Sequence, residues 1–110
     1  CRMVLSVPNE GAIDGLEDDD VVEITCDIHS DGAHPIHIGV IDEFQLQQIK
    51  RLKYFERCTI QAILHDDRDS AVKGLALHPL VNDFELAETL SGIFFKEYAS
   101  FIHMNEAPGQ

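Results

Sequence analysis

The sequence predicts an α+β fold (mixed α/β), in which a small sheet formed early in the chain is covered by three later helices. Two observations lead to this prediction. Before Asp42, apolar and polar residues alternate along extended segments. From Asp42 onward, apolar residues recur every three or four positions, which is the helical period. Strands followed by helices favour a layer of helices on one face of a sheet.

Two segments, Arg2–Val7 and Val21–Ile28, are predicted to be strands. The second alternates strictly, and its apolar face consists of Val22, Ile24, Cys26 and Ile28. A connection rich in asparagine and glycine runs from Pro8 to Gly15 between them. After a Gly-Ala-His-Pro loop, Ile36–Val40 is expected to form either a third short strand or an extended crossing segment.

Three helices are expected after Asp42. The first is long and amphipathic over roughly 24 residues, with its stripe formed by Leu46, Ile49, Leu52, Thr59, Ile60 and Ile63. A short second helix begins at caps offered by Asp66, Asp67 and Asp69, and Pro79 ends it. Asn82, with Glu85 three residues later, resembles a capping box. The third helix that starts there has its apolar positions at Leu86, Leu90, Ile93, Phe94 and Phe101, and the chain end 105–110 is expected to fray.

Composition and charge limit the classes of function. With 110 residues, the chain has the length of one domain, 1–110, and 45% hydrophobic residues favour a soluble globular protein. A net charge of −12 argues against binding to nucleic acid or to an anionic membrane, because both attract clustered Lys and Arg. No apolar run approaches the ~20 residues of a membrane span. Three unevenly spaced cysteines form no disulfide framework, which favours the cytoplasm.

Cys26, His29, His34 and His37 form a C-x2-H-x4-H-x2-H pattern of zinc-type ligands. Cys26 falls on the apolar face of its strand, however, where a free cysteine behaves as a small hydrophobic residue. That interpretation is favoured, and no residue is assigned to a metal. A Ser-His-Asp triad drawn from Ser30, Asp31 and His34 lacks a G-x-S-x-G elbow. No glycine-rich dinucleotide or phosphate loop is present either.

Many hydrolases use a pair of carboxylates in catalysis, and this chain contains several candidate carboxylates. The run Glu17–Asp20 lies in a turn, where charge is usually solvated. Glu56 interrupts the apolar stripe of the long helix, so its carboxylate is expected to be paired or to lie at the edge of a cavity. The structural interpretation, an ion pair, is favoured over a role in an active-site wall. Lys53 and Tyr54 beside it are expected on an outer face or at an interface.

Several short motifs occur in an order that resembles one enzyme family, the family 4 glycoside hydrolases, and the 6-phospho-β-glucosidases in particular. The motifs are V-x-N-x-G-A-I at Val7–Ile13, L-x-x-D-x-V-V-E at Leu16–Glu23, GAHP at Gly32–Pro35 followed by Gly39, K-x-x-E-x-x-T-x-x-A at Lys53–Ala62, and HPLV at His78–Val81. The match covers almost the whole chain. It corresponds to the C-terminal domain of such an enzyme.

The resemblance implies a parent enzyme similar to lactate and malate dehydrogenases, with an N-terminal Rossmann domain that binds NAD. In this family NAD oxidises the sugar at C3, a tyrosine removes the acidified C2 proton, and a divalent metal, often manganese, stabilises the enediolate before elimination. The implied substrate is a 6-phospho-glycoside, and a homo-oligomer is implied as well. The nucleotide glycines, metal ligands and tyrosine base belong to segments before Cys1, and the start inside a strand favours a fragment.

No catalytic, cofactor-binding or metal-binding residue is therefore expected within these 110 residues, and the fragment alone is expected to be inactive. Asn9, His34 and Glu56 are the residues expected to line the substrate cleft from the C-terminal side. Two alternatives stay open. One is a stand-alone acidic interaction module that uses its helices to form a dimer, and the other is a small metal-binding domain built on the segment from Cys26 to His37.

Overall fold

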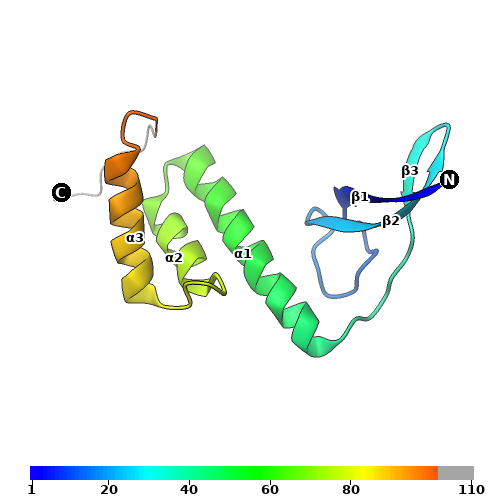
Figure 1. Ribbon diagram of the computed structural model, residues 1–110, viewed down its shortest axis with the longest axis horizontal. Helices are drawn as coiled ribbons and strands as arrows, with labels where there is room; N and C mark the ends of the chain where they lie inside the picture. The colour runs from blue at the N-terminus through cyan, green and yellow to red at the C-terminus, as the bar shows by residue number, and fades with distance from the viewer. Residues whose placement is uncertain (102–110) are drawn as a thin grey trace. The chain divides into compact units, whose positions relative to one another are not determined.

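The computed structural model describes residues 1–101 of the chain. These residues belong to two compact units, one of which is Cys1–Gln47 while the other begins at Gln48. The first unit contains a three-stranded sheet, and the second contains most of α1 together with α2 and α3 (Figure 1). The predicted α+β class, with one small sheet and three helices, is confirmed. That residues 1–110 form a single domain stays a prediction, as does the frayed end 105–110, which lies outside the described residues.

The sheet is antiparallel and has the order β1-β2-β3, so that β2 lies in the centre. Its strands are β1 (Arg2–Pro8), β2 (Val21–His29) and β3 (Gly32–Pro35). Leu5 pairs with Ile24 across β1 and β2, and Cys26 pairs with Pro35 across β2 and β3. The two strands predicted from alternation are both present, each extended by one residue.

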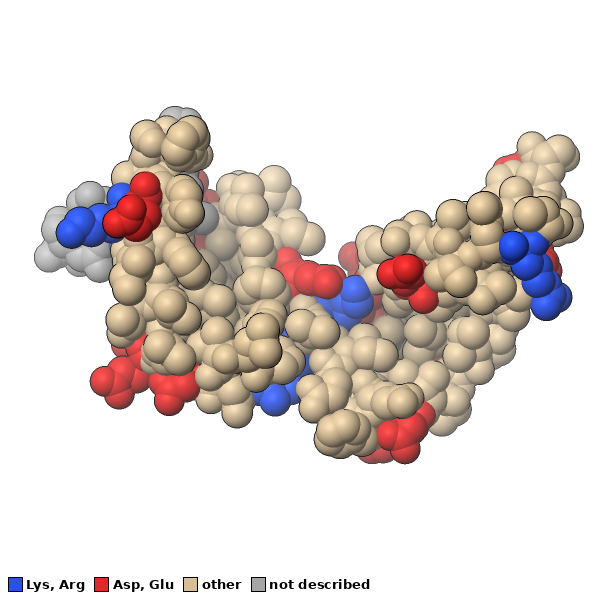
Figure 2. All heavy atoms as spheres, in the orientation of Figure 1, with Lys and Arg blue, Asp and Glu red and all other residues tan. Residues whose placement is uncertain are grey.

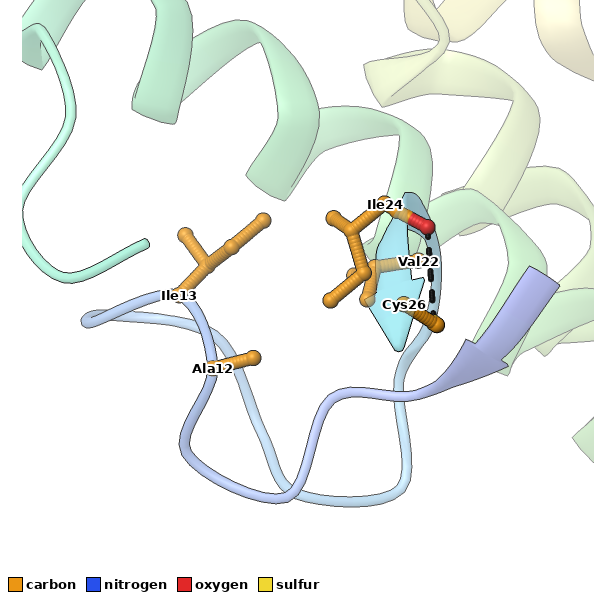
Figure 3. Packing of buried hydrophobic residues seen from close by; sticks show 5 residues of the cluster. All are labelled: Ala12, Ile13, Val22, Ile24 and Cys26. Atoms are coloured by element: carbon orange, nitrogen blue, oxygen red, sulfur yellow. Dashed lines mark hydrogen bonds between the residues drawn. The ribbon is translucent and has the colours of Figure 1, made fainter. Parts of the chain in front are cut away.

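The core of the first unit forms between one face of β2 and the loop that follows β1. Figure 3 shows its buried members, which are Ala12, Ile13, Val22, Ile24 and Cys26. Burying a side chain such as Val22 or Ile24 stabilises the fold by roughly 1.5–3 kcal/mol. Cys26 has no exposed surface, and its Sγ lies 3.5 Å from the carbonyl oxygen of Ile24. Its interpretation as a small hydrophobic residue is thus confirmed.

The third strand lies four residues earlier than predicted. The Gly-Ala-His-Pro segment, expected to be a loop, forms β3 and pairs with the end of β2, because Ser30 and Asp31 close a tight hairpin. Gly32 has a φ of +128°, which a residue with a side chain rarely adopts. Ile36–Val40 is the extended crossing segment, and a parallel bridge between Ile13 and Gly39 joins it to the loop that follows β1.

The long helix α1 spans Glu43–His65, as its apolar period predicts. Asp42 precedes it, and one carboxylate oxygen of Asp42 accepts hydrogen bonds from the backbone N–H groups of Phe44 (3.1 Å) and Gln45 (3.3 Å). These bonds satisfy N–H groups that the first turn of a helix leaves without partners. Leu46, in the same turn, packs against Gly15, whose φ is +93°. The start of α1 is thereby fixed to the sheet unit.

The two shorter helices are α2 (Arg68–Leu77) and α3 (Phe84–Glu97). Asp67 caps α2, one of the three aspartates predicted for that role, and its carboxylate accepts from the backbone N–H of Ser70 at 3.2 Å. The capping prediction for α3 was one residue off. Asp83, not Asn82, is the N-cap and accepts from the backbone N–H of Leu86 at 2.7 Å.

Asn82 has a different role, because its φ of +48° places it outside the helix and its side-chain oxygen accepts a hydrogen bond from Arg51. Phe101 was wrongly placed on the apolar stripe of the third helix: α3 ends at Glu97, and Phe101 is largely exposed in a turn beyond it. The helices α2 and α3 pack together, with the Arg68 guanidinium 4.7 Å from the centre of the Phe95 ring.

No helix among residues 1–101 combines the length and the hydrophobicity that crossing a bilayer requires. On the face of the described residues that Figure 2 shows, Lys and Arg form separate spots rather than one continuous patch. That the chain does not bind nucleic acid stays a prediction.

Candidate functional site

Asn9 is the most completely buried polar residue among those predicted to line a cleft, with 0% of its surface exposed. Its side-chain amide donates to the carbonyl oxygens of Ile13 (3.1 Å) and Leu16 (3.3 Å). Its side-chain oxygen accepts from the backbone N–H of Ile13 at 2.8 Å. The asparagine thus crosslinks the loop that follows β1. That Asn9 lines a substrate cleft stays a prediction.

A second buried polar residue, Asp20, forms hydrogen bonds at the C-terminal end of the same loop. Asp20 is 6% exposed, and its carboxylate accepts from the backbone N–H of Glu17 at 3.1 Å. Its backbone oxygen accepts from the N–H of Asn9 at 2.8 Å. The acidic run was interpreted as solvated charge, and for Asp20 that interpretation was wrong. The alternation of β2 gave no sign of it, since Asp20 precedes the strand.

Glu17, Asp19 and Asp20 place carboxylate oxygens within 4.8 Å of one another, which is close enough to share a cation. Glu17 and Asp19 are exposed, while the Asp20 carboxylate is already bonded to the backbone. Three carboxylates in an exposed turn are fewer than the six or more oxygen ligands that a hard cation takes. The group is therefore part of the loop structure.

His34 lies on β3, near the tip of the hairpin, and is half exposed. Its Nε2 is 2.8 Å from a carboxylate oxygen of Asp31, and its ring meets the His29 ring edge to face with 4.8 Å between centres. The hydrogen bond to His34, and then the charge of that histidine, hold the pKa of Asp31 below its ordinary value. The pairing of Asp31 with His34 was foreseen only as part of a hypothetical triad with Ser30.

Glu56 is half exposed on α1 and forms an ion pair with Lys53, whose Nζ lies 3.0 Å from the Glu56 carboxylate. The structural interpretation of this glutamate is thus confirmed. The Lys53 side chain, expected on an outer face or at an interface, is only 14% exposed, so its stem is packed and its charged end meets Glu56. That Glu56 lines a substrate cleft stays a prediction.

The four residues of the Cys-His pattern do not converge. Cys26 faces the core, whereas His29 is three residues along the same strand and lies on the opposite face. His37 lies beyond β3, where its ring packs against Gly39. Sequence spacing suggested a shared site, but the pleat of β2 separates the thiol from the imidazoles. The hypothesis that all four residues together bind one metal ion was therefore wrong.

Comparison with known proteins identifies the domain. The family model for the family 4 glycosyl hydrolase C-terminal domain matches residues 1–81. The chain belongs to this family. The resemblance seen in its short motifs is therefore confirmed.

Several curated enzymes are similar to the chain. It is 39% identical over 87 residues to the 6-phospho-beta-glucosidase BglT of Thermotoga maritima, an alignment that covers 79% of this chain and 21% of BglT. It is 34% identical over 89 residues to the 6-phospho-beta-glucosidase of Escherichia coli, with 79% and 20% covered. The chain thus spans about a fifth of the length of these relatives.

Solved structures show the same fold. The 6-phospho-beta glucosidase from Thermotoga maritima, solved with NAD and glucose-6-phosphate, superposes with a TM-score of 0.82 at 33% identity, and the match covers 94% of this chain and 25% of that one. A 6-phospho-alpha-glucosidase from gut microorganisms, solved with NAD and Mn2+, superposes with a TM-score of 0.90 at 24% identity, covering 96% and 24%. At that identity, the second comparison supports the fold alone.

The residues of this chain do not themselves fit the two cofactors of those structures. A dinucleotide needs a glycine-rich turn at the start of a helix, and each described helix instead begins at an aspartate whose carboxylate occupies the N–H groups of the first turn. Among residues 1–101, the one group of three carboxylates close enough to share a cation has its buried member, Asp20, bonded to the backbone. No catalytic step through NAD or a metal is therefore derived from this chain.

Proposed function

We propose that this chain is the C-terminal substrate and oligomerisation domain of a 6-phospho-beta-glucosidase. The parent enzyme hydrolyses 6-phosphorylated glycosides by an NAD-dependent oxidation and elimination that also uses a divalent metal ion such as Mn2+. NAD supplies reversible oxidation of the sugar, and the metal supplies charge stabilisation. The observation that carries this proposal is the 39% identity to BglT over 87 residues, most of the chain.

The chain's own contribution is to build a wall of the substrate site. The loop after β1 is held rigid by the buried amide of Asn9, whose three hydrogen bonds fix Ile13 and Leu16. A loop that is ordered before substrate arrives costs less free energy to organise on binding. His34 lies at the other end of the sheet, on the β2–β3 hairpin, and is proposed as a second residue that lines the cleft. Glu56, which forms an ion pair with Lys53 on α1, is also proposed to line the substrate cleft.

Exposed apolar side chains support the view that the domain works inside a larger protein. Several large hydrophobic residues of the described chain are largely exposed, namely Val40, Phe44, Leu64, Leu80 and Phe101. We propose that other parts of the enzyme cover some of this apolar surface. The alignment covers only 21% of BglT, so the rest of such an enzyme and a second subunit are the proposed partners. The proposed location is the cytoplasm, and neither nucleic acid nor a membrane is a proposed partner.

A domain exchange tests the proposal directly. The C-terminal segment of BglT that aligns with this chain is replaced by the chain, and cleavage of an aryl 6-phospho-beta-glucoside is measured with NAD and Mn2+. The expected result is turnover that depends on both cofactors, well above that of BglT lacking the segment. The 110-residue chain alone is expected to show no cleavage, because its residues fit neither cofactor.

The control is the same exchange carrying Asn9→Ala, which is expected to lower turnover by loosening the loop. An exchanged enzyme that is folded and binds NAD, yet cleaves no faster than BglT without the segment, would contradict the proposal. Turnover only with the alpha anomer of the substrate would replace the beta assignment by the alpha one.

A further inference from the structure

Two imidazoles converge on the outer face of the β2–β3 hairpin. The inner face of β2 carries Ile24 and Cys26, so Asp27 and His29 lie on the opposite, outer face. His34 on β3 pairs directly with Asp27 and therefore shares that face. His29 is two residues along from Asp27, which makes it the diagonal neighbour of His34. The two rings contact each other with 4.8 Å between their centres.

Asp31 fixes which nitrogen of the His34 ring carries the proton. Its carboxylate oxygen lies 2.8 Å from Nε2 of His34, so in the neutral imidazole this nitrogen carries the proton and donates it to the carboxylate. The lone pair is then on Nδ1 and free to bind a cation. A carboxylate that orients a histidine through its other ring nitrogen is the usual arrangement behind a metal-binding imidazole.

Other charges on this face do not compete for the imidazoles. Asp27, the residue opposite His34, is bound by Arg2, whose Nε lies 2.8 Å from its carboxylate. The thiol of Cys26 is sealed in the core behind the strand. The nitrogen donors His29 and His34 therefore stand as a pair at an exposed position, accessible from solvent.

We propose that His29 and His34 form a two-histidine site for a late first-row divalent ion such as Zn2+, with Asp31 as the positioning residue for His34. Imidazole nitrogens suit zinc, copper and nickel better than magnesium or calcium. Water molecules complete the coordination of the ion. The site is separate from the Glu17–Asp20 turn, which offers oxygen ligands only and suits harder cations.

Titration of the full 110-residue chain with ZnCl2, followed by calorimetry, tests the site. All proteins carry Cys1→Ser, which removes an exposed thiol that could bind zinc on its own. The expected result is one equivalent of Zn2+ per chain. His29→Gln and His34→Gln are each expected to lower the association constant by at least about tenfold, and Asp31→Asn by about tenfold as loss of a positioning carboxylate does.

His37→Gln is the matched control, since this exposed histidine lies outside the pair and its loss should leave zinc binding unchanged. A readout on the unmutated histidines removes any dependence on how the variants fold. Zinc should shift the ring nitrogen resonances of His29 and His34 in 15N spectra and leave those of His37 in place.

Three results would overturn the assignment. One is the lack of saturable zinc binding, and another is binding that survives both glutamine substitutions. The third is binding that is lost on Asp19→Asn, which would place the ion in the acidic turn instead.

Discussion

Gly74 of α2 lies against Cys58 of α1 so closely that a Cβ added to Gly74 would stand 2.7 Å from the Cβ of Cys58. The same Cβ would lie 3.4 Å from the carbonyl oxygen of Phe55. The Cβ of Cys58 and the carbonyl oxygen of Phe55 are held in place by the backbone of α1, so neither can move aside as the end of a long side chain could. The contact between these two helices therefore depends on the lack of a side chain at residue 74.

Gly74→Ala is expected to destabilise the chain by about 1–3 kcal/mol, because overpacking must push the two helices apart. Gly92 provides a matched control in α3, where the nearest atom to an added Cβ is the end of the Arg68 side chain at 3.8 Å. Gly92→Ala should stabilise the chain by about 0.5–1 kcal/mol through the better helix propensity of alanine. Urea unfolding followed by circular dichroism measures both. Equal effects of the two substitutions would contradict the close approach.

Asn9→Ala is expected to cost about 2–4 kcal/mol, since it leaves the buried N–H of Ile13 and the carbonyls of Ile13 and Leu16 without their partner. Asn9→Asp keeps the acceptor for Ile13 but places a carboxylate oxygen against two carbonyl oxygens. This variant should therefore be no more stable than the alanine variant. Chemical unfolding measures the change, with Gln48→Ala as the control because that amide is exposed on α1. A loss below 0.5 kcal/mol for Asn9→Ala, within the usual range of surface changes, would rule out the crosslink.

Asp83→Ala should destabilise the chain by about 1 kcal/mol by removing the N-cap of α3. Asp83→Ser, which retains an oxygen acceptor, should lose much less. Asn82→Ala discriminates between the two candidate caps, because Asn82 accepts from Arg51 and does not bond to the first turn. Amide hydrogen exchange at Leu86 reports the cap itself. Faster exchange there in the Asn82 variant but not in the Asp83 variant would reverse the assignment.

Asp31 should titrate at a lower pH than a free aspartate, whose pKa is 3.8, because its hydrogen bond to His34 and the charge of that ring favour the carboxylate form. A lowered pKa in the folded state means that this pair contributes to stability above pH 3.8 and that the contribution is lost as the pH falls through the folded value. His34→Gln should bring the Asp31 pKa back toward 3.8, as followed by NMR of its side-chain carboxyl carbon.

Asp67 serves as the internal control for that titration. Its pKa is also lowered, chiefly by the hydrogen bond from the Ser70 side chain. Ser70→Ala should raise the pKa of Asp67 and leave Asp31 unchanged, while His34→Gln should do the reverse. If both substitutions moved both carboxyls together, a general change in charge rather than the two local hydrogen bonds would be responsible.

The elements of this fold could be predicted from local patterns. The alternation in Val21–Ile28 and the apolar spacing after Asp42 are strong periodic signals, and β2 and α1 follow them within a residue or two. The strand β3 could not be found this way. Gly-Ala-His-Pro contains no β-branched residue, and it becomes a strand only because the hairpin turn brings it into register with Cys26.

The candidate site was less accessible from sequence, for a physical reason. Alternation placed Cys26 on the apolar face, but the predicted strand ended at Ile28, so the face that His29 occupies was not predicted. Spacing also does not indicate whether a loop turns a side chain inward. Cys26 and His29 are three residues apart yet face opposite sides of β2. Asp20 reads as one more surface acid, and only the folded loop shows that it is buried. The motif around Asn9 suggested a residue near the substrate cleft, but it did not indicate that the Asn9 side chain bonds to the loop that follows β1.

The position of β1 at the rim of the sheet has a practical consequence. Among residues 1–101, no strand pairs with the side of β1 turned away from β2, and Met3 and Val4 are both half exposed there. A row of open amide groups beside apolar side chains offers a template on which another extended chain can add. Concentrated samples of the isolated domain are therefore expected to form strand-linked aggregates, and dilute conditions suit each of the measurements above.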